Sequence, residues 1–235
     1  MKIALLSDIH GNHHALEAVL EAVARQNIST LFVLGDIVGY YYRPDVVLRL
    51  LGDFQTTWIR GNHEVILNNL RNKTLDPEVV RKKYGSGASL ALEILSSDQI
   101  DMLVQLPDLR HLEIGGVSFT LCHGSPSDPN RYVYPDTSGE SLAECASVVK
   151  SDFLLMGHTH YPFVNVKNGV VLVNPGSVGQ PRDQSAGASW AVIDTESKSL
   201  VFKQTPYPTS ELINEINRID PDVSFLREVL TRKPR

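Results

Sequence analysis

The chain has 235 residues, of which 42% are hydrophobic and 21% are charged, and it carries a formal net charge of −5 at pH 7. This composition is typical of a folded globular protein, and the length suits a single α/β domain. The negative charge argues against a protein that coats nucleic acid, and the lack of a signal-peptide pattern or of an apolar run of roughly 20 residues predicts a cytoplasmic protein with no membrane partner.

Strands and helices alternate at the start of the chain. Short apolar runs predict strands at Lys2–Ser7, Thr30–Leu34 and Thr56–Ile59. Apolar residues at helical spacing predict a helix over His13–Gln26, and a proline in the first turn predicts another over Pro44–Leu51. This order is typical of a parallel sheet with crossover helices.

A helical insertion is expected next, at about 64–106. The helical pattern is clearest from about Glu78 to Gln105. Ser96 and Gln99 resemble a capping box, at which a second helix of the insertion would begin.

The second half of the chain is mostly β. Gly115-Gly116, between Arg110–Ile114 and Val117–Cys122, predicts a hairpin. A helix near Glu140–Lys150 precedes a strand at Phe153–Met156. Further strands are expected at Phe163–Val166, Val170–Val173, Trp190–Asp194 and Leu200–Gln204.

The chain closes with a helical tail at about 209–235. Four apolar residues of the tail share one helical face: Val223, Leu226, Val229 and Leu230. This face would either pack on the body or pair two subunits, which leaves the oligomeric state open. The simplest fold is a single domain over residues 1–235, of the α/β class, with two sheets that are each covered by helices.

Polar residues gather at the ends of five predicted strands. The clusters are Asp8-Ile9-His10, Gly35-Asp36, Gly61-Asn62-His63-Glu64, Leu121-Cys122-His123-Gly124 and Met156-Gly157-His158-Thr159-His160. In open α/β sheets, ligands bind at the carboxyl ends of the strands. We therefore expect these clusters to form one site.

The clusters contain the residue types that bind transition metals. The candidate ligands are Asp8, His10, Asp36, Asn62, His123, His158 and His160. Seven ligands suffice for two four-coordinate ions if Asp36 bridges them. Mixed imidazole and carboxylate ligands favour Mn, Fe, Zn or Co over Mg or Ca, and two neighbouring ions can clamp the oxygens of a phosphoryl transfer.

The order of these motifs resembles the calcineurin-like metallophosphoesterases. The strings DIH, GDIVG, GNHE, a lone His followed by Gly, and GHTH occur in that order from Asp8 to His160. VNPGSVGQPR (Val173–Arg182) resembles the small bacterial and archaeal phosphodiesterase branch. The resemblance implies a four-layer αββα sandwich of two sheets flanked by helices, with a dinuclear site between loops.

The resemblance also implies a role for each residue of the site. One metal would be held by Asp8, His10, Asp36 and His160, and the other by Asp36, Asn62, His123 and His158. A hydroxide between two divalent ions (Mn, Fe, Zn, Co or Ni) would attack phosphorus. His63 would protonate the leaving oxygen or stabilise its charge as the catalytic acid.

The expected activity is therefore metal-dependent hydrolysis of phosphoester bonds in a small phosphorylated substrate, such as a nucleotide. Phosphodiesters are favoured, and a dinucleoside polyphosphate hydrolase and a phosphomonoesterase are the alternatives. A non-catalytic scaffold on the same fold is an alternative of another class, but such a scaffold should lack His63 or a ligand.

Three further residues are candidates for substrate binding: Asn12, Asn174 and Arg182. Asn12 could instead cap the first helix, and Arg182 could be an ordinary surface residue rather than a phosphate clamp. Tyr40–Tyr42 could stack on a nucleobase or pack against the helical insertion. Cys122 and Cys145 lack CxxC spacing and are expected to be buried thiols.

Overall fold

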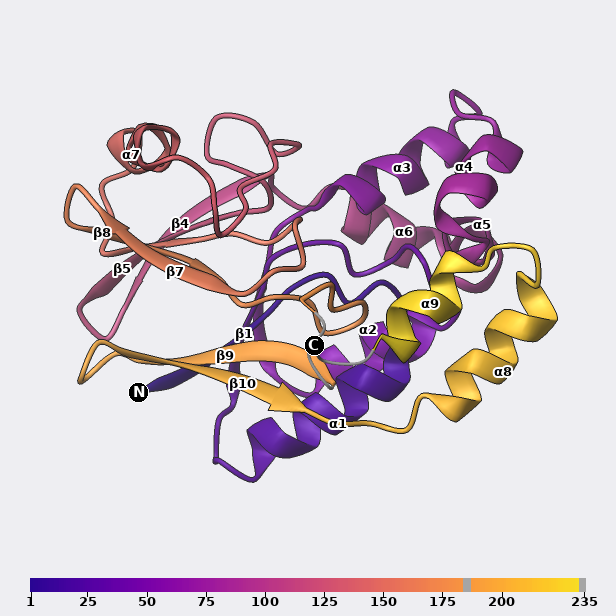
Figure 1. Ribbon diagram of the computed structural model, residues 1–235, viewed down its shortest axis with the longest axis horizontal. Coiled ribbons are helices and arrows are strands. Elements are labelled where there is room, and N and C mark those ends of the chain that lie inside the picture. The colour runs from indigo at the N-terminus through magenta and orange to yellow at the C-terminus, as the bar shows by residue number, and fades with distance from the viewer. Residues whose placement is uncertain (184–186, 233–235) are drawn as a thin grey trace.

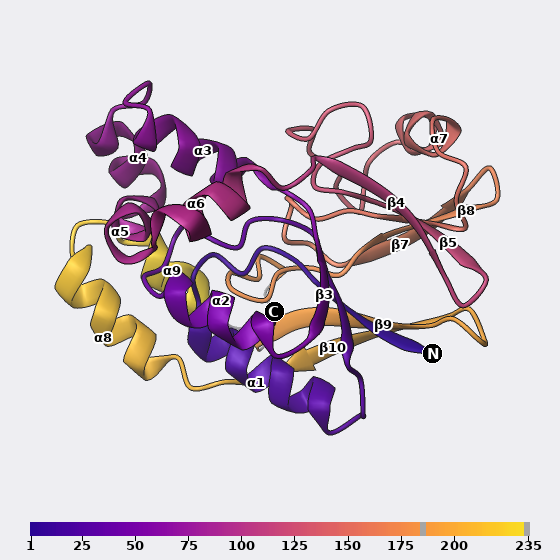
Figure 2. The ribbon, with the colours of Figure 1, turned by 180° about the vertical axis from the view of Figure 1, so that it is seen from behind.

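Two five-stranded sheets form the centre of the computed structural model, which describes residues 1–183 and 187–232 (Figures 1 and 2). The first sheet has the order β10-β9-β1-β2-β3. Its parallel strands are β1 (Lys2–Leu6), β2 (Thr30–Val33) and β3 (Gln55–Trp58), and its antiparallel strands are β9 (Ala188–Asp194) and β10 (Ser199–Thr205). The predicted strand–helix alternation and the parallel pairing of β1, β2 and β3 are confirmed, whereas β9 and β10 make the sheet mixed.

Two crossover helices cover the outer face of the first sheet. Helix α1 (His13–Ala24) turns Leu16, Val19 and Val23 inward, and α2 (Pro44–Gly52) begins at its proline as predicted. Both helices pack with the sheet in one apolar cluster. Apolar residues at helical spacing thus decide which face each helix buries.

The second sheet has the order β4-β5-β6-β8-β7. Its strands are β4 (Leu109–Ile114), β5 (Val117–Cys122), β6 (Phe153–Leu155), β7 (Phe163–Lys167) and β8 (Val170–Asn174). The hairpin at Gly115-Gly116 is confirmed, while β5, β6 and β8 run parallel. Helix α7 (Gly139–Ser147) packs on the outer face of this sheet.

The inner faces of the two sheets pack on each other. Along β1, Ile3 and Leu5 face the second sheet, where they meet Phe119 and Leu155, while Ala4 and Leu6 face the helices of the outer layer. Because successive side chains of a strand point to opposite faces, β1 contributes both to the core between the sheets and to the core beneath α1 and α2. The layers are helix, sheet, sheet and helix (Figure 1), which is the four-layer fold that the sequence predicts.

Four helices form the insertion between β3 and β4: α3 (Asn62–Arg71), α4 (Pro77–Tyr84), α5 (Gly87–Ile94) and α6 (Ser97–Val104). The capping box of Ser96 and Gln99 at the start of α6 is confirmed. Helix α3 falls almost wholly within the insertion predicted at about 64–106, but it precedes the clearest helical pattern, which begins at about Glu78. The buried face of α3 includes His63 and Glu64 beside Leu67 and Leu70, so two of its four buried residues are polar.

The chain ends in α8 (Ser210–Ile219) and α9 (Phe225–Thr231). Val223 and Leu226 are buried against Tyr40–Tyr42, so this face of the tail packs on its own body. The Asp220 carboxylate is buried between the two helices and accepts hydrogen bonds from the Tyr42 hydroxyl at 3.0 Å and the Ser86 amide at 2.8 Å. Within the described residues, no helix has the length and apolar character that crossing a membrane requires.

Candidate metal centre

Five strand ends converge between the two sheets. The predicted ligands follow β1 (Asp8, His10), β2 (Asp36), β3 (Asn62), β5 (His123) and β6 (His158, His160). Their atoms form close groups, each within 4.8 Å: Asp8 with His10 and His160, Asp36 with His123 and His158, and His10 and Asp36 with His63. The structure therefore brings together the residues that the sequence selects. Two of the groups contain residues that the family resemblance assigns to one ion each, and the third adds His63 to His10 and Asp36.

Asp36 and Asn62 connect to these groups at short range. The Oδ2 atom of Asp36 lies 3.7 Å from His10 Nε2 and 3.3 Å from His123 Nε2, so it lies between the two groups. The Oδ1 atom of Asn62 lies 3.1 Å from His123 Nε2. These positions suit a carboxylate that is shared between two ions and an amide oxygen that completes the second set of ligands.

Five of the predicted ligands have a left-handed backbone. The φ angles are 54° at Asp8, 53° at His10, 53° at Asp36, 67° at His158 and 63° at His160. Residues other than glycine rarely adopt this region, which costs roughly 1–3 kcal/mol each, and such strain gathers at functional sites. Hydrogen bonds between neighbouring loops, such as His10 N–H to the Asp36 carbonyl at 2.9 Å, hold this conformation.

Main-chain carbonyls orient three of the imidazole rings. In each ring Nδ1–H donates a hydrogen bond to a main-chain carbonyl. The His10 ring donates to Val38 at 3.2 Å, the His123 ring to Leu34 at 2.7 Å, and the His160 ring to Gln180 at 2.7 Å. A ring that is neutral and donates through Nδ1 has a bare lone pair on Nε2. All three Nε2 atoms therefore face the centre of the site as potential metal ligands.

The donor atoms at the centre fit a cation. The Nε2 atoms of His10 and His160 lie 3.2 Å apart, so two lone pairs face each other when both rings are neutral. The Oδ1 atom of Asp8 and the Nε2 atom of His158 are buried and have no hydrogen-bond partner within the described residues. Bare lone pairs and orphaned acceptors are what divalent ions satisfy, and this imidazole and carboxylate set suits transition metals.

The pKa shifts within the cluster also favour a bound cation. Burial works to raise the pKa of the Asp8 and Asp36 carboxyls, but the neighbouring histidines outweigh it and hold both below their usual range. Burial works to lower the pKa of His123, but Asp36 and Asp8 raise it to about 10. The two carboxylates thus draw positive charge into the centre, which is the charge that bound cations carry.

Glu64 ties two of the strand-end loops together. Its carboxylate accepts the N–H groups of Asp36 at 3.0 Å, Ile37 at 2.8 Å, Val38 at 3.1 Å and Gly61 at 2.8 Å. Burial, with Asp36 nearby, raises the pKa of Glu64 to about 7, while the amides oppose the shift. Glu64 thus orients the predicted ligand Asp36 through its main-chain N–H, while lying in the first turn of α3.

Gly39, the second glycine of the GDIVG motif, lies directly against the rings of two histidines. A Cβ added to Gly39 would lie 2.6 Å from Nδ1 of His10 and 2.6 Å from Nδ1 of His63. The φ angle of Gly39 is +140°, which other residues rarely adopt. A side chain at this position would displace both rings.

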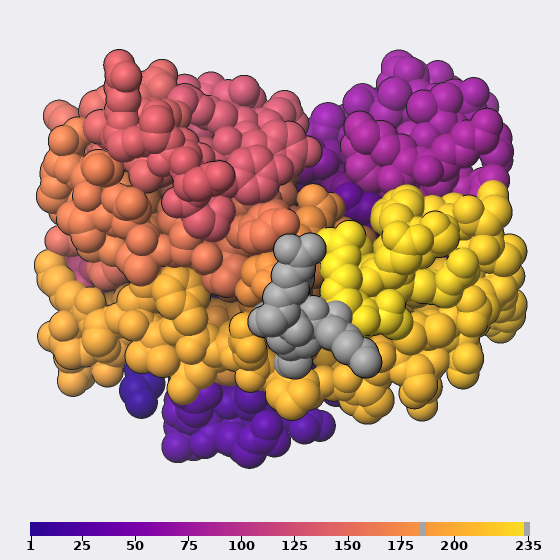
Figure 3. Space-filling view, viewed as in Figure 1, coloured from indigo at the N-terminus to yellow at the C-terminus, as the bar shows by residue number. Residues whose placement is uncertain are grey.

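His63 lies at the floor of a cavity over the ligands. The walls of this cavity are Asp36, Tyr40, Asn62, His63, Tyr84, Tyr132, His158, His160 and Arg182. Tyr40 and Tyr84 hold the His63 ring, at centroid distances of 4.9 Å and 4.8 Å. The space-filling view has a notch between the helical insertion and the loops of the second sheet (Figure 3). Tyr84 and Tyr132 are cavity residues that no sequence motif indicates.

The three predicted substrate-binding residues lie in different places. Asn12 caps α1 by accepting Ala15 N–H at 3.1 Å, and it donates to the Gly179 carbonyl. Asn174 is buried and donates to the Gly157 carbonyl at 2.6 Å, so it supports the GHTH loop. Only Arg182 lines the cavity, where it donates to the Tyr40 hydroxyl at 3.0 Å.

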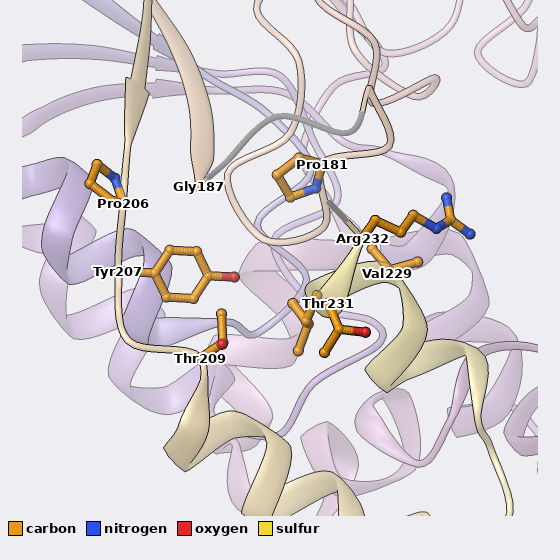
Figure 4. A pocket seen from close by; sticks show the side chains of 9 residues that line it. Pro181, Gly187, Pro206, Tyr207, Thr209, Val229, Thr231 and Arg232 are labelled. Carbon is orange, nitrogen blue, oxygen red and sulfur yellow. The ribbon is translucent and has the colours of Figure 1, made fainter. Parts of the chain in front are cut away.

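A separate cavity of about 270 Å³ lies beneath α9 (Figure 4). Its described walls include Tyr207, Thr209, Val229 and Arg232, but no carboxylate and no imidazole. The described walls of this cavity therefore offer none of the predicted metal ligands.

Comparison with known proteins agrees with this chemistry. A family model of the calcineurin-like phosphoesterase superfamily domain matches residues 1–198. An uncharacterized protein of Methanocaldococcus jannaschii is 31% identical and covers 91% of each chain. The phosphodiesterase YfcE of Escherichia coli K12 is 26% identical and covers 86% of this chain and 91% of the relative.

A solved structure has the same fold over nearly its whole length. The metallophosphoesterase from Sphaerobacter thermophilus is 25% identical and superposes with a TM-score of 0.81, covering 99% of this chain and 98% of that one. The two-sheet fold therefore recurs in a protein that is named a metallophosphoesterase.

Proposed function

The chain belongs to the calcineurin-like phosphoesterase superfamily and is a hydrolase of phosphoester bonds, and from this premise we propose that it hydrolyses phosphodiesters with two divalent transition-metal ions. The observation that carries the proposal is the pair of ligand groups, each within 4.8 Å, beneath a cavity that also contains His63. The ion identity remains open among Mn, Fe, Zn, Co and Ni.

The residues of the chain divide the work between them. Asp8, His10 and His160 would hold one ion, while His123, His158 and Asn62 would hold the other, with Asp36 shared. When bound, such ions lower the pKa of water so that hydroxide forms near neutral pH, and they offset charge on the phosphoryl oxygens. Glu64 keeps Asp36 in place through its amide.

His63 is the proposed proton donor to the leaving oxygen. Burial lowers the pKa of His63 to about 4, so the ring is neutral near pH 7 before substrate binds. The negative charge of a bound phosphodiester would favour the protonated ring, which donates its proton to the leaving oxygen and returns to the neutral form. Its Nδ1 atom is buried and has no hydrogen-bond partner within the described residues, and Tyr40 and Tyr84 fix the ring plane. The ring is therefore held for contact with substrate.

Two observations favour a diester over a monoester. Arg182 is the one cationic side chain in the described walls of the cavity, which suits the single charge of a diester better than the double charge of a monoester. The relative YfcE is also named a phosphodiesterase. Phosphomonoesters and dinucleoside polyphosphates remain the alternative substrates.

A non-catalytic scaffold is the alternative from another class. It is disfavoured because this chain keeps all seven ligands and His63. We further propose a small phosphorylated substrate, such as a nucleotide, and a cytoplasmic location.

The test is a substrate screen with metal-reconstituted protein. Bis-p-nitrophenyl phosphate, p-nitrophenyl phosphate and a dinucleoside polyphosphate are supplied in parallel with Mn, Fe, Co, Zn or Ni, and His63→Ala serves as the blank. We expect the highest kcat/KM for the diester. Hydrolysis of none of them by protein with two bound ions would overturn the proposal.

A further inference from the structure

A third cavity, of about 610 Å³, adjoins the cavity over the predicted metal ligands. Its walls are Tyr134, Pro135, Asp136, Tyr161 and Arg182, and Arg182 also lines the cavity over the metal ligands. We propose that this cavity, here called the aromatic subsite, binds the nucleobase of a nucleotide diester whose phosphate lies at the metal centre. The inference rests on the proposed function and names its substrate class.

A continuous series of rings leads from the metal ligands to the subsite. The Tyr132 ring lies 4.1 Å from the ring of His158, and it stacks on Tyr134 at 5.8 Å with an interplanar angle of 8°. Tyr161 meets Tyr134 edge-on at 5.8 Å. A planar base in this subsite could stack on one tyrosine ring and meet another edge-on, which are the two arrangements that aromatic pairs prefer.

The loop that carries these tyrosines is built to present them. Val133 is buried in the core under α7, so the neighbouring Tyr132 and Tyr134 point outward and are 53% and 38% exposed. Arg131 fastens the loop to α7 through Ser141 at 2.7 Å. The Tyr134 amide and the Thr137 hydroxyl close a turn at 2.8 Å. A held loop loses little entropy when a ligand binds, so exposed rings on it favour recognition.

The charges of the subsite select a nucleoside over a polyphosphate. Its described walls contain one cation, Arg182, and one carboxylate, Asp136. A second and third phosphate would meet too little positive charge and would be repelled by Asp136. Asp136 can instead accept the amino or hydroxyl hydrogens of a nucleoside, while Arg182 faces the phosphate from the shared wall.

The sharing of Arg182 between the cavities also fits the shape of a nucleotide. The guanidinium carbon lies 6.0 Å from the Tyr40 ring centroid and its Nη2 donates to the Tyr40 hydroxyl, so Arg182 is held at the boundary. A phosphate beside His158 and a base beside Tyr134 would then lie on opposite sides of Arg182. The ribose would span the ring of Tyr132.

Binding measurements test the subsite without turnover. Isothermal titration of manganese-loaded protein compares AMP with ribose 5-phosphate, which lacks the base. We expect AMP to bind about 10-fold tighter or more, since stacking one base on an aromatic ring has about that effect. Tyr134→Ala should remove most of this ratio, whereas Tyr134→Phe should keep it.

Phe202→Ala is the matched control, because Phe202 is also 38% exposed but lies on β10, outside both cavities. It should leave the ratio unchanged. Equal binding of AMP and ribose 5-phosphate, or a ratio that survives Tyr134→Ala, would overturn the inference.

Hydrolysis separates this inference from the proposed function. The p-nitrophenyl ester of a nucleoside 5′-phosphate is compared with methyl p-nitrophenyl phosphate. We expect a kcat/KM ratio above about 10 in favour of the nucleotide, reduced by Tyr134→Ala. Equal hydrolysis of both esters would overturn the subsite and leave the phosphodiesterase intact. Hydrolysis of neither would overturn the proposed function, while the AMP titration would still decide the subsite.

Discussion

Glu64 accepts the backbone N–H of Asp36 at 3.0 Å, while the Asp36 carboxylate accepts the backbone N–H of His63 at 2.8 Å. The predicted bridging ligand and the first turn of α3 therefore hold each other in place. The Glu64 carboxylate has no exposed surface and binds four amides, two at each oxygen. The metal centre is thus supported by a carboxylate that need not touch a metal.

Replacing Glu64 with Gln is expected to damage both stability and activity. A Gln side chain keeps one acceptor oxygen, so two of the four amides would face an NH₂ group. Two buried donors without partners cost about 2–5 kcal/mol in the free energy of unfolding, which urea denaturation would measure. Glu21→Gln on the exposed face of α1 is the control and should change stability by less than about 1 kcal/mol. Equal effects of the two variants would contradict the supporting role of Glu64.

Replacing His63 with Ala is expected to lower kcat for a diester by about 10²–10⁴-fold, which is the usual contribution of a general acid. Metal content should stay near that of the native protein. His111→Ala is the matched control, because His111 lies on β4 and hydrogen-bonds to Thr120 at 2.8 Å. Unchanged kcat in His63→Ala with full metal content would show that the ring is not catalytic.

Asp220 and Asp222 are expected to differ sharply in their contributions to stability. Asp220 is buried and accepts from Tyr42 and Ser86, so Asp220→Ala leaves those donors without a partner and should cost about 2–4 kcal/mol. The Asp222 side chain is 61% exposed and pairs with Arg81, so Asp222→Ala should cost less than about 1 kcal/mol. Thermal unfolding of both variants compares them directly, and a larger loss for Asp222 would refute the difference.

The two cysteines are expected to resist thiol reagents in the folded protein. Burial raises the pKa of the Cys122 and Cys145 thiols, so little thiolate forms at pH 8. Between the ordinary and the raised pKa, the unfolded state binds fewer protons, so stability falls as pH rises above about 8.5. Titration with an aromatic disulfide should detect no fast-reacting thiol at pH 8 and two after unfolding. A fast thiol in the native protein would contradict the burial.

Much of the fold was readable from local pattern. Short apolar runs indicate the strands, Pro44 indicates the start of α2, and Ser96 with Gln99 indicates α6. Helix α3 falls within the predicted insertion, but its bounds are harder to predict because two of its buried residues, His63 and Glu64, are polar and serve the site.

The sequence likewise predicts some residues of the site and not others. The seven ligands follow strands, so their convergence could be inferred from the carboxyl ends of a parallel sheet. Tyr84 and Tyr132 could not, because each reaches the cavity from an element whose position depends on tertiary packing. Asn12 and Asn174 resembled substrate contacts, but their side chains bind main-chain groups, a choice that only three-dimensional neighbours decide.

The most direct test of the metal centre is anomalous X-ray diffraction from crystals grown with manganese. We expect two anomalous peaks per chain, one beside Asp8, His10 and His160 and the other beside Asp36, His123 and His158. An Asp36 carboxylate in contact with both peaks would complete the result. A single peak, or peaks away from these residues at full manganese loading, would contradict the proposed dinuclear centre.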